Sequence, residues 1–443
     1  MVAQANQNSG SHQWLSPENF YRFVLFALLL RVLLMPFFGH VDVLSEARRI
    51  YFWDISGIYF DDISRNATSI FQLFFFKLFS WMIESKEVLF AHADMANSTA
   101  RPNEYFEFVS HPEIYRALFV IKLPFLAADL ITAWALYRFC GSDAGAKRAT
   151  LLWLFNPITI FAFYIFGRFE SIPIMFCMLA ILAVSRQRIL LGALMVGLSM
   201  NSRELFILLG PVFIALMFSK SAVGISMAVR LIASSIVLFA LAVSLQLISL
   251  TGSDVDTFGR EVSSIATEGR VEYLFRFIVG SFLVFPMAFF AALLFAWNSR
   301  TELNDILPLS FMLVLFAFFL FSSHTAHYTS WLVIFPCIYF AKEPRLFRPV
   351  VLLCITWIFY NLAITDLGVF TTWLASPWSI HFAGLPHFPG LYTVLGLHEK
   401  LDLLTYGRVW STFYRACILY LGVQICWSYW QSTRSKAPGS SAS

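Results

Sequence analysis

The feature that most constrains this chain is a long series of apolar segments separated by short turns rich in lysine and arginine. A helix needs about 20 mainly apolar residues to cross a bilayer, and backbone polar groups in lipid must be satisfied within the helix. The pattern therefore predicts an all-α polytopic membrane protein with about 11–13 transmembrane helices, folded as one integral membrane domain over residues 1–443. The apolar segments lie near residues 20–38, 115–139, 149–166, 171–185, 189–200, 205–218, 223–250, 272–297, 304–321, 328–341, 349–364 and 406–430.

Composition agrees with this class. Hydrophobic residues make up 58% of the chain and charged residues only 13%, whereas soluble domains are about 25% charged. The net charge of +4 does not call for a nucleic-acid partner, because the basic residues fall in short turns, as the positive-inside rule requires of cytoplasmic loops. These turns predict a cytoplasmic tail at 431–443 and a first segment that stays as a span rather than being cleaved as a signal peptide. The predicted inner residues are Arg138, Lys147, Arg148, Arg186, Arg188, Lys220, Arg300, Lys342, Arg345, Arg348, Arg434 and Lys436.

The same parity assigns most polar residues to the opposite, exofacial side. The predicted outer loops are residues 39–114, 167–171, 201–204, 251–271, 322–327 and 365–405. Residues 69–83 are apolar, but inserting them as a further span would place every later basic turn outside. Polar residues flank them on both sides, so we expect a juxtamembrane or re-entrant helix within the long first loop.

Four polar elements recur in a recognisable order along the first 220 residues. They are His40-Val41-Asp42 after the first span, Lys122-Leu-Pro124 with Asp129, Asn156-Pro157, and the turn from Gly167 to Ser171. This order resembles the GT-C superfamily of polyprenyl-phosphate-sugar-dependent glycosyltransferases. Arg168 stands where that family usually has glutamine, and Glu170 where it usually has aspartate. The later turn 322–328 is similar to the histidine- or tyrosine-bearing turn of related enzymes.

The resemblance implies an inverting glycosyltransferase that moves a hexose, with mannose the expected sugar, from a polyprenyl-phosphate donor to a lipid-linked or glycan acceptor. The site would face the periplasm or the lumen of a bacterial inner membrane or an endoplasmic reticulum membrane. An inverting transfer needs a carboxylate to accept the hydroxyl proton and cationic groups around the departing phosphate. No cofactor and no metal are expected, because the acidic residues of the first loop do not form a D-x-D pair.

Asp42 is the expected catalytic base, since it lies at the membrane surface where the donor head group would be presented. Asp54, Asp61 and Asp62 are rival carboxylates in the same loop. The expected donor phosphate-binding residues are Arg203, Arg168, His324 and His327. The expected sugar- or acceptor-binding residues are Glu170, Glu204 and Tyr328.

Asp129 falls near the middle of its apolar segment, where a charge normally faces a polar partner inside a bundle. Two helical turns separate it from Lys122, so no salt bridge between these two is expected. We interpret Asp129 and Asn156 as helix-packing contacts, because chemistry at the outer surface would not reach them. Lys122 is expected either to extend to the surface or to be paired inside the bundle.

Two alternatives from other classes stay open. A lipid or solute transporter, or a flippase, would also carry charged and broken-helix elements, but the Lys122-to-Glu170 pattern has no second copy in the chain. A non-catalytic subunit of a glycosylation complex would keep the fold and lose the chemistry, against which Asp42 is a small argument. An O-antigen ligase or polymerase would have its main outer loop late in the chain, whereas here the first is the largest.

Overall fold

The structure is a computed structural model. It describes residues 16–56, 66–90, 102–141, 143–219, 284–299, 302–321, 326–364, 373–384 and 403–435. Every regular element within these residues is a helix. In chain order they are α1 (Pro17–Leu34), α2 (Val41–Ser56), α3 (Asn66–Phe79), η3 (Ser80–Met82), α4 (Lys86–Phe90), α5 (Pro102–Ser110), α6 (Ile114–Cys140), α7 (Asp143–Leu154), α8 (Pro157–Ile160), η4 (Phe161–Ile165), α9 (Ser171–Ser185), α10 (Ile189–Met200), η5 (Glu204–Leu208), α11 (Leu209–Ser219), α15 (Val284–Asn298), α16 (Leu303–Phe321), η6 (Ala326–Thr329), α17 (Ser330–Lys342), η7 (Pro344–Leu346), α18 (Phe347–Ile364), η9 (Ile380–Gly384) and α20 (Leu403–Ser435).

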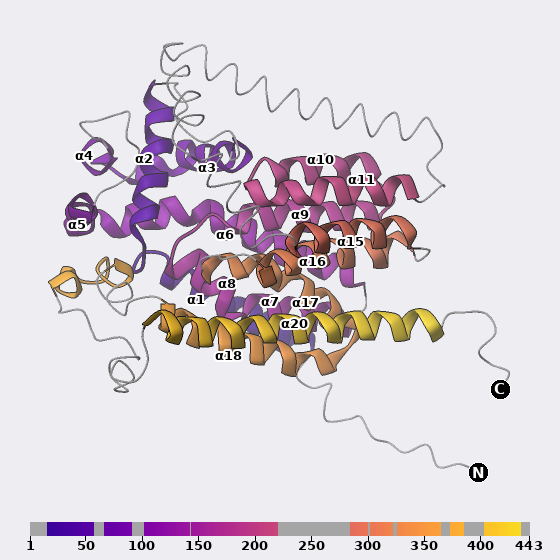
Figure 1. The fold of residues 1–443 in the computed structure, drawn as a ribbon. Coiled ribbons are helices and arrows are strands. Elements are labelled where there is room, and N and C mark those ends of the chain that lie inside the picture. The colour runs from indigo at the N-terminus through magenta and orange to yellow at the C-terminus, as the bar shows by residue number, and fades with distance from the viewer. Residues whose placement is uncertain are drawn as a thin grey trace, which may run out of the picture.

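Most of these helices run side by side in one bundle, and α2 crosses one end of it (Figure 1). Helices α3, α4 and α5 gather around α2 at that end, so much of the first loop is folded rather than extended. Arg48 of α2 is tied to Glu104 of α5 by a 2.6 Å ion pair. Residues 16–34 and 403–435, near the two ends of the chain, both belong to the bundle.

The predicted apolar segments that fall within the described residues coincide with helices. Three of the described helices are long and apolar enough to cross a membrane: Ile114–Cys140, Leu303–Phe321 and the stretch Pro344–Leu362. A fourth candidate is the pair Ala144–Leu154 and Pro157–Ile165, which is bent by 44°. The all-helical class and the membrane protein are thus supported. The predicted segment 223–250 lies outside the described residues.

The bend has a local cause in the Asn156-Pro157 dipeptide. Proline at the first helical position starts α8, and the Asn156 side chain caps it by accepting a 2.9 Å hydrogen bond from the Ile158 amide. Proline cannot continue the preceding helix, so α7 ends at Leu154. The next five residues form a π-helical turn, η4, which leads directly into the turn at Gly167. The break therefore aims the chain toward the 167–171 turn.

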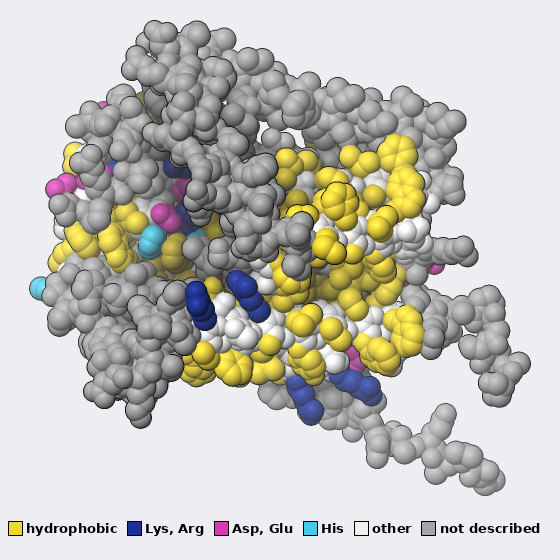
Figure 2. All heavy atoms as spheres, viewed as in Figure 1, with side chains coloured by type: hydrophobic (Ala, Val, Ile, Leu, Met, Phe, Trp, Pro, Cys, Tyr) yellow, Lys and Arg dark blue, Asp and Glu magenta, His cyan; other side chains and the backbone are white. Residues whose placement is uncertain are grey.

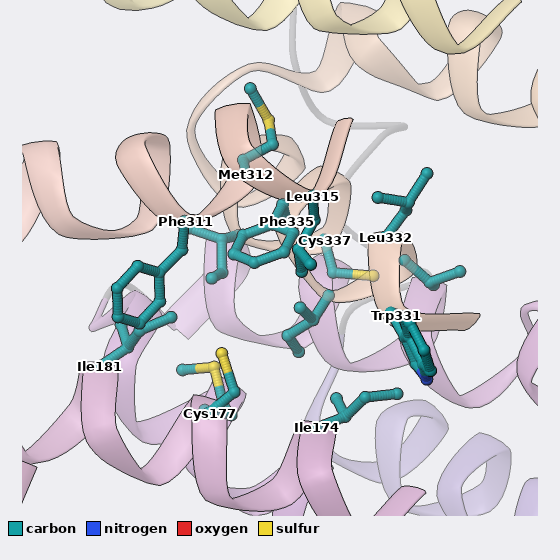
Figure 3. Packing of buried hydrophobic residues seen from close by; sticks show 14 of the residues in the cluster. Ile174, Cys177, Ile181, Phe311, Met312, Leu315, Trp331, Leu332, Phe335 and Cys337 are labelled. Carbon is teal, nitrogen blue, oxygen red and sulfur yellow. The ribbon is translucent and has the colours of Figure 1, made fainter. Parts of the chain in front are cut away.

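The central core lies between α9, α16 and α17. Figure 3 shows Cys177 and Ile181 of α9 facing Phe311 and Leu315 of α16. Trp331, near the beginning of α17, is fully buried in the same cluster. This core fixes the start of α17 relative to α9, a relation that matters for the site below.

Large hydrophobic side chains are also abundant on the outside of the bundle. Figure 2 shows them over the flank formed by α10, α11, α15 and α20. Phe290 of α15, Phe413 of α20 and Leu25 of α1 are all more than half exposed. An apolar flank of this extent is a property of proteins that face lipid or a partner.

Two predicted boundaries need correction. The tail was expected to begin at residue 431, but α20 continues through Ser435. The prediction failed because Ser432 and Thr433 were taken as helix-ending residues, whereas a helix already formed tolerates polar residues in its last turns. The expected helix at 69–83 is present as α3 followed by η3, and it begins earlier, at Asn66.

Candidate functional site

Turns that lie far apart in the sequence meet at the end of the bundle crossed by α2. The His40 amide donates to the Phe166 carbonyl at 3.1 Å, which joins the start of the first loop to the 167–171 turn. The Ala67 amide donates to the Asn201 carbonyl at 3.1 Å, which joins α3 to the 201–204 turn. The Tyr105 hydroxyl donates to the Gly39 carbonyl at 2.6 Å. Predicted outer turns are thus gathered at one end, whichever side of a membrane that end faces.

Lys122 anchors two of these turns from inside the bundle. Its ammonium group donates to the carbonyls of Met35 at 3.0 Å and Tyr164 at 2.8 Å, and also to the Phe38 carbonyl. The side chain is completely buried. Of the two expectations for Lys122, the structure therefore shows the buried one, with backbone carbonyls as its partners.

A separate polar network lies deeper in the bundle around Asp129. Its carboxylate accepts hydrogen bonds from Arg31 at 2.6 Å, Trp153 at 2.6 Å and Tyr164 at 2.7 Å. Arg31 and Asp129 are both fully buried. The expectation that Asp129 is a packing contact and does not pair with Lys122 is confirmed. Arg31 was not singled out in the sequence, although an arginine inside an apolar segment is itself a signal of a buried partner.

Asp42 lies in the first turn of α2 and meets the 167–171 turn. Its Oδ2 atom is 2.9 Å from Arg168 Nη1 and 3.3 Å from His40 Nδ1. The Asp42 side chain is 35% exposed, whereas that of Arg168 is 10% exposed. The carboxylate is consequently held by a buried cation and still open to solvent on one side.

The electrostatic surroundings keep Asp42 ionised. Burial acts to raise its pKa, but the contact with His40 and the charge of Arg168 outweigh that effect and hold the pKa well below its usual range. The position at a helix N-terminus favours the negative charge further. Asp42 is thus deprotonated at neutral pH, and its carboxylate can accept a hydrogen bond.

Gly167 allows this close approach. Its φ is +82°, a conformation that side-chain-bearing residues rarely adopt. A Cβ atom there would lie 2.5 Å from Val43 Cγ2 and 3.1 Å from Lys122 Cε. Glycine therefore lets the turn lie against α2 and places Arg168 next to Asp42.

Glu170 is a fully buried carboxylate between two guanidinium groups. Its Oε2 accepts a 2.7 Å hydrogen bond from Trp331 Nε1. Its Oε1 is 3.9 Å from Arg168 Nε and 3.8 Å from Arg203 Nε, and it has no hydrogen-bond partner within the described part of the chain. Both ion pairs on this side of Glu170 are therefore longer than a hydrogen bond.

Arg203 is enclosed by aromatic rings. Its guanidinium carbon lies 4.9 Å from the Tyr328 ring centroid and 5.3 Å from that of Phe169. One guanidinium nitrogen also donates to the Tyr328 hydroxyl. Stacking of this kind suits the planar guanidinium and holds it in one orientation.

His327 is buried beside the same cluster. Its ring stacks on Phe166 with the centroids 4.6 Å apart. Burial lowers the pKa of His327 well below its ordinary value, and the nearby charge of Arg168 lowers it further. The imidazole is accordingly neutral near pH 7, so it can exchange hydrogen bonds but would not supply a positive charge.

The structure thus brings together six of the expected site residues. They come from α2, the 167–171 turn, the 201–204 turn, and η6, and they are Asp42, Arg168, Glu170, Arg203, His327 and Tyr328. Formally they carry two negative and two positive charges. We refer to them below as the six-residue cluster.

The comparisons with known proteins leave the chain without a family. No family model and no curated protein matches it. The argument for function therefore rests on the cluster itself.

The remaining expected residues lie elsewhere or outside the description. His324, Asp61 and Asp62 fall outside the described residues, and so does the side chain of Glu204, which begins η5. Asp54 is paired at 3.5 Å with Lys77 and lies away from the charges of the cluster in chain order and in contacts. Within the described part of the chain, no group of three histidine, cysteine or acidic side chains is arranged to hold a metal ion.

Two cluster contacts were missed at the level of sequence. Trp331 supplies the hydrogen bond to Glu170, and Phe166 stacks on both His40 and His327. Phe166 carried no signal, because one aromatic among 49 phenylalanines is not distinctive. Trp331 stood next to the histidine-bearing turn, and its indole N–H required a partner once buried.

Proposed function

We propose that this chain is an inverting glycosyltransferase that moves a hexose, with mannose as the first candidate, from a polyprenyl-phosphate donor to a lipid-linked or glycan acceptor. The proposal includes a GT-C-like architecture with about 11–13 transmembrane helices. It also places the cluster end of the bundle on the periplasmic or luminal face of the membrane. The basic turns at the other end support this orientation.

The observation that carries the proposal is the partly exposed Asp42 carboxylate held by a buried arginine. A general base must reach the proton it accepts and must be ionised at the working pH. Asp42 meets both conditions through its exposure and its lowered pKa. A carboxylate needed only for packing would be expected to be enclosed like Asp129.

The proposed step is a single displacement. The acceptor hydroxyl oxygen forms a bond to the anomeric carbon as the bond from that carbon to the phosphate oxygen breaks, so the configuration is inverted. The hydroxyl proton passes to Asp42, and the electron pair of the broken bond leaves with the polyprenyl phosphate. The leaving phosphate gains negative charge in this step, and nearby cations lower the barrier.

Arg168 is the first candidate for contact with that phosphate. Its Nη1 is engaged by Asp42, while its Nε has no hydrogen bond within the described residues. Arg203 is more enclosed, so its proposed contribution is electrostatic and acts from behind Tyr328. Glu170 balances the two arginines and keeps both in place before the donor binds. Tyr328, His327, Glu204 and His324 remain candidates for contacts with the sugar, the acceptor or the phosphate.

The test is sugar transfer from defined polyprenyl-phosphate donors by membranes that contain the wild-type chain or Asp42→Asn. Mannose, glucose, galactose and arabinose donors are each radiolabelled and incubated with a lipid or glycan extract. We expect transfer from one donor by the wild type and a loss of about 10²–10⁴-fold in Asp42→Asn, the usual contribution of a general base.

Asp54→Asn is the matched control. Asp54 lies on the same helix α2 and has its own partner, Lys77. Transfer by this variant should equal that of the wild type. If Asp42→Asn and the wild type transfer equally well, Asp42 is not the base. If the wild type transfers no sugar from any of these donors, the transporter or accessory-subunit alternatives replace the proposal.

A further inference from the structure

The opposite end of the bundle contains a cavity of about 310 Å³ that has no place in the proposed transfer reaction. It lies where α6, α9 and α17 end and α16 begins. Helix α9 runs from Ser171 beside Glu170 to Ser185 at this cavity, a rise of about 20 Å at 1.5 Å per residue. The two sites are therefore separated by most of the bundle's length.

The charged residues of this cavity come from three different turns. Arg138 comes from the end of α6, Arg186 follows α9, and Lys342 ends α17. Asp305 of α16 also lines the cavity and pairs with Lys342 at 2.7 Å. Three positive charges thus face one negative charge, and neither Arg138 nor Arg186 has an ion-pair partner among the described residues.

The rest of the lining is apolar or lacks a donor. Phe139, Ile338 and Ala341 supply hydrophobic surface next to the basic side chains. The Asn304 amide oxygen is buried at the cavity and accepts no hydrogen bond within the described part of the chain. The volume is within the range of about 300–1,000 Å³ that ligand pockets occupy.

We propose that this cavity binds the phosphate of an anionic phospholipid headgroup. Arginine forks match phosphate oxygens, and Arg138 and Arg186 are the residues that would hold the phosphate. A headgroup hydroxyl, such as that of a glycerol, would donate to the Asn304 oxygen. The apolar lining suits the glycerol backbone and first methylenes, which an inorganic phosphate would leave empty.

The location agrees with a lipid source for the phosphate. Arg138, Arg186 and Lys342 belong to the basic turns that the sequence assigns to the cytoplasmic side, and basic pockets between helices on that side bind anionic headgroups. The exposed apolar flank of the bundle shows that lipid would surround these helices. The inference holds whether or not the chain transfers sugar.

The test uses the full chain purified in a mild detergent and titrated with phosphatidylglycerol, phosphatidylcholine or inorganic phosphate. Native mass spectrometry counts bound lipid, and thermal unfolding follows stabilisation. We expect the wild type to bind phosphatidylglycerol at least tenfold more tightly than phosphatidylcholine, and the double variant Arg138→Gln with Arg186→Gln to lose that preference. Millimolar inorganic phosphate should neither stabilise the protein nor displace the lipid.

The matched control is the double variant Arg188→Gln with Arg345→Gln. It removes the same charge from neighbouring basic turns, and both side chains are exposed and lie outside the cavity lining. This variant should keep the wild-type preference. An equal loss in both double variants would show general surface attraction and overturn the proposal. Displacement by inorganic phosphate would overturn the lipid assignment, and an unfolding temperature that matches the wild type without ligand shows that the cavity variant is folded.

Discussion

The network around Asp129 and the six-residue cluster around Asp42 use the same side-chain types with opposite consequences. Asp129 accepts three hydrogen bonds of 2.6–2.7 Å and is completely buried. In the cluster, Asp42 is partly exposed, and Glu170 has ion pairs of 3.8 and 3.9 Å on its Oε1 side. The first arrangement is closed, whereas the second leaves polar atoms available.

This difference separates a structural role from a chemical one. A buried charge that is fully engaged holds helices together, and losing one partner strands the other. A carboxylate that is ionised, oriented and still reachable can take part in a reaction. Because Lys122 lies between the two regions and binds carbonyls near both, the closed network also fixes the turns that carry the open cluster.

The largest effect is expected from Arg31→Ala. It removes the 2.6 Å contact to Asp129 and leaves a carboxylate in the bundle without its cation. Breaking a buried pair in this way costs about 3–5 kcal/mol in the free energy of unfolding. Thermal or denaturant unfolding in detergent measures the loss.

Arg22→Ala is the control for that variant, since Arg22 is on the same helix α1. Its pair with Glu18 is exposed on both sides, and such pairs contribute little to stability. We expect no measurable change in unfolding. Equal stability of the two variants would mean that the Asp129 network does not hold α1 to α6, and the contrast between the two regions would fail.

A smaller effect is expected from Gly167→Ala. The left-handed backbone costs about 1–2 kcal/mol for alanine, and the new Cβ must push away Val43 or Lys122. That displacement separates Arg168 from Asp42, so donor-dependent sugar transfer should fall by about 10²-fold, the loss typical of a misplaced catalytic group. Initial rates and unfolding are measured on the same preparations.

Gly141→Ala tests whether the backbone strain alone is responsible. Gly141 has a φ of +69°, but its nearest neighbour to an added Cβ is 3.9 Å away. This variant should lose some stability and keep its transfer rate. A transfer rate reduced as much as in Gly167→Ala would point to global destabilisation instead of a displaced turn.

Helices and their ends were largely predictable from sequence, because each apolar segment reports its own burial. The segment at 115–139 became α6, and the turn signals at Asn156 and Gly167 fell where the chain breaks and reverses. The parity of basic turns also gathered the outer turns correctly at one end. The extent of α20 was missed because polar residues at a helix end carry little information about where it stops.

The pairing inside the site was less predictable. Arg203 was expected to hold a phosphate or pair with a neighbouring glutamate, and the structure instead places it against Glu170, which lies 33 positions earlier, and against Tyr328. Such contacts depend on how α9 and α17 pack, which no local pattern encodes. Arg31 and Asp129 each announced a buried partner, but the sequence could not say that they were partners of each other.

The smallest effect, and the one most specific to the cluster, is expected from Arg168→Gln. Removing this cation loses one charge-assisted contact to Asp42, and we expect kcat/KM for sugar transfer to fall about tenfold near neutral pH, equivalent to about 1.4 kcal/mol. The pKa of Asp42 is lowered by Arg168, so it should rise in the variant. Because the base is lost as pH falls through that pKa, the acid limb of the pH–rate profile should move to higher pH. Arg116→Gln, a change at an exposed surface pair, should leave both the rate and the acid limb unchanged. A tenfold loss with an unmoved acid limb would mean that Arg168 acts on the leaving phosphate alone and that Asp42 is tuned by His40, which would narrow the open region to a single arginine.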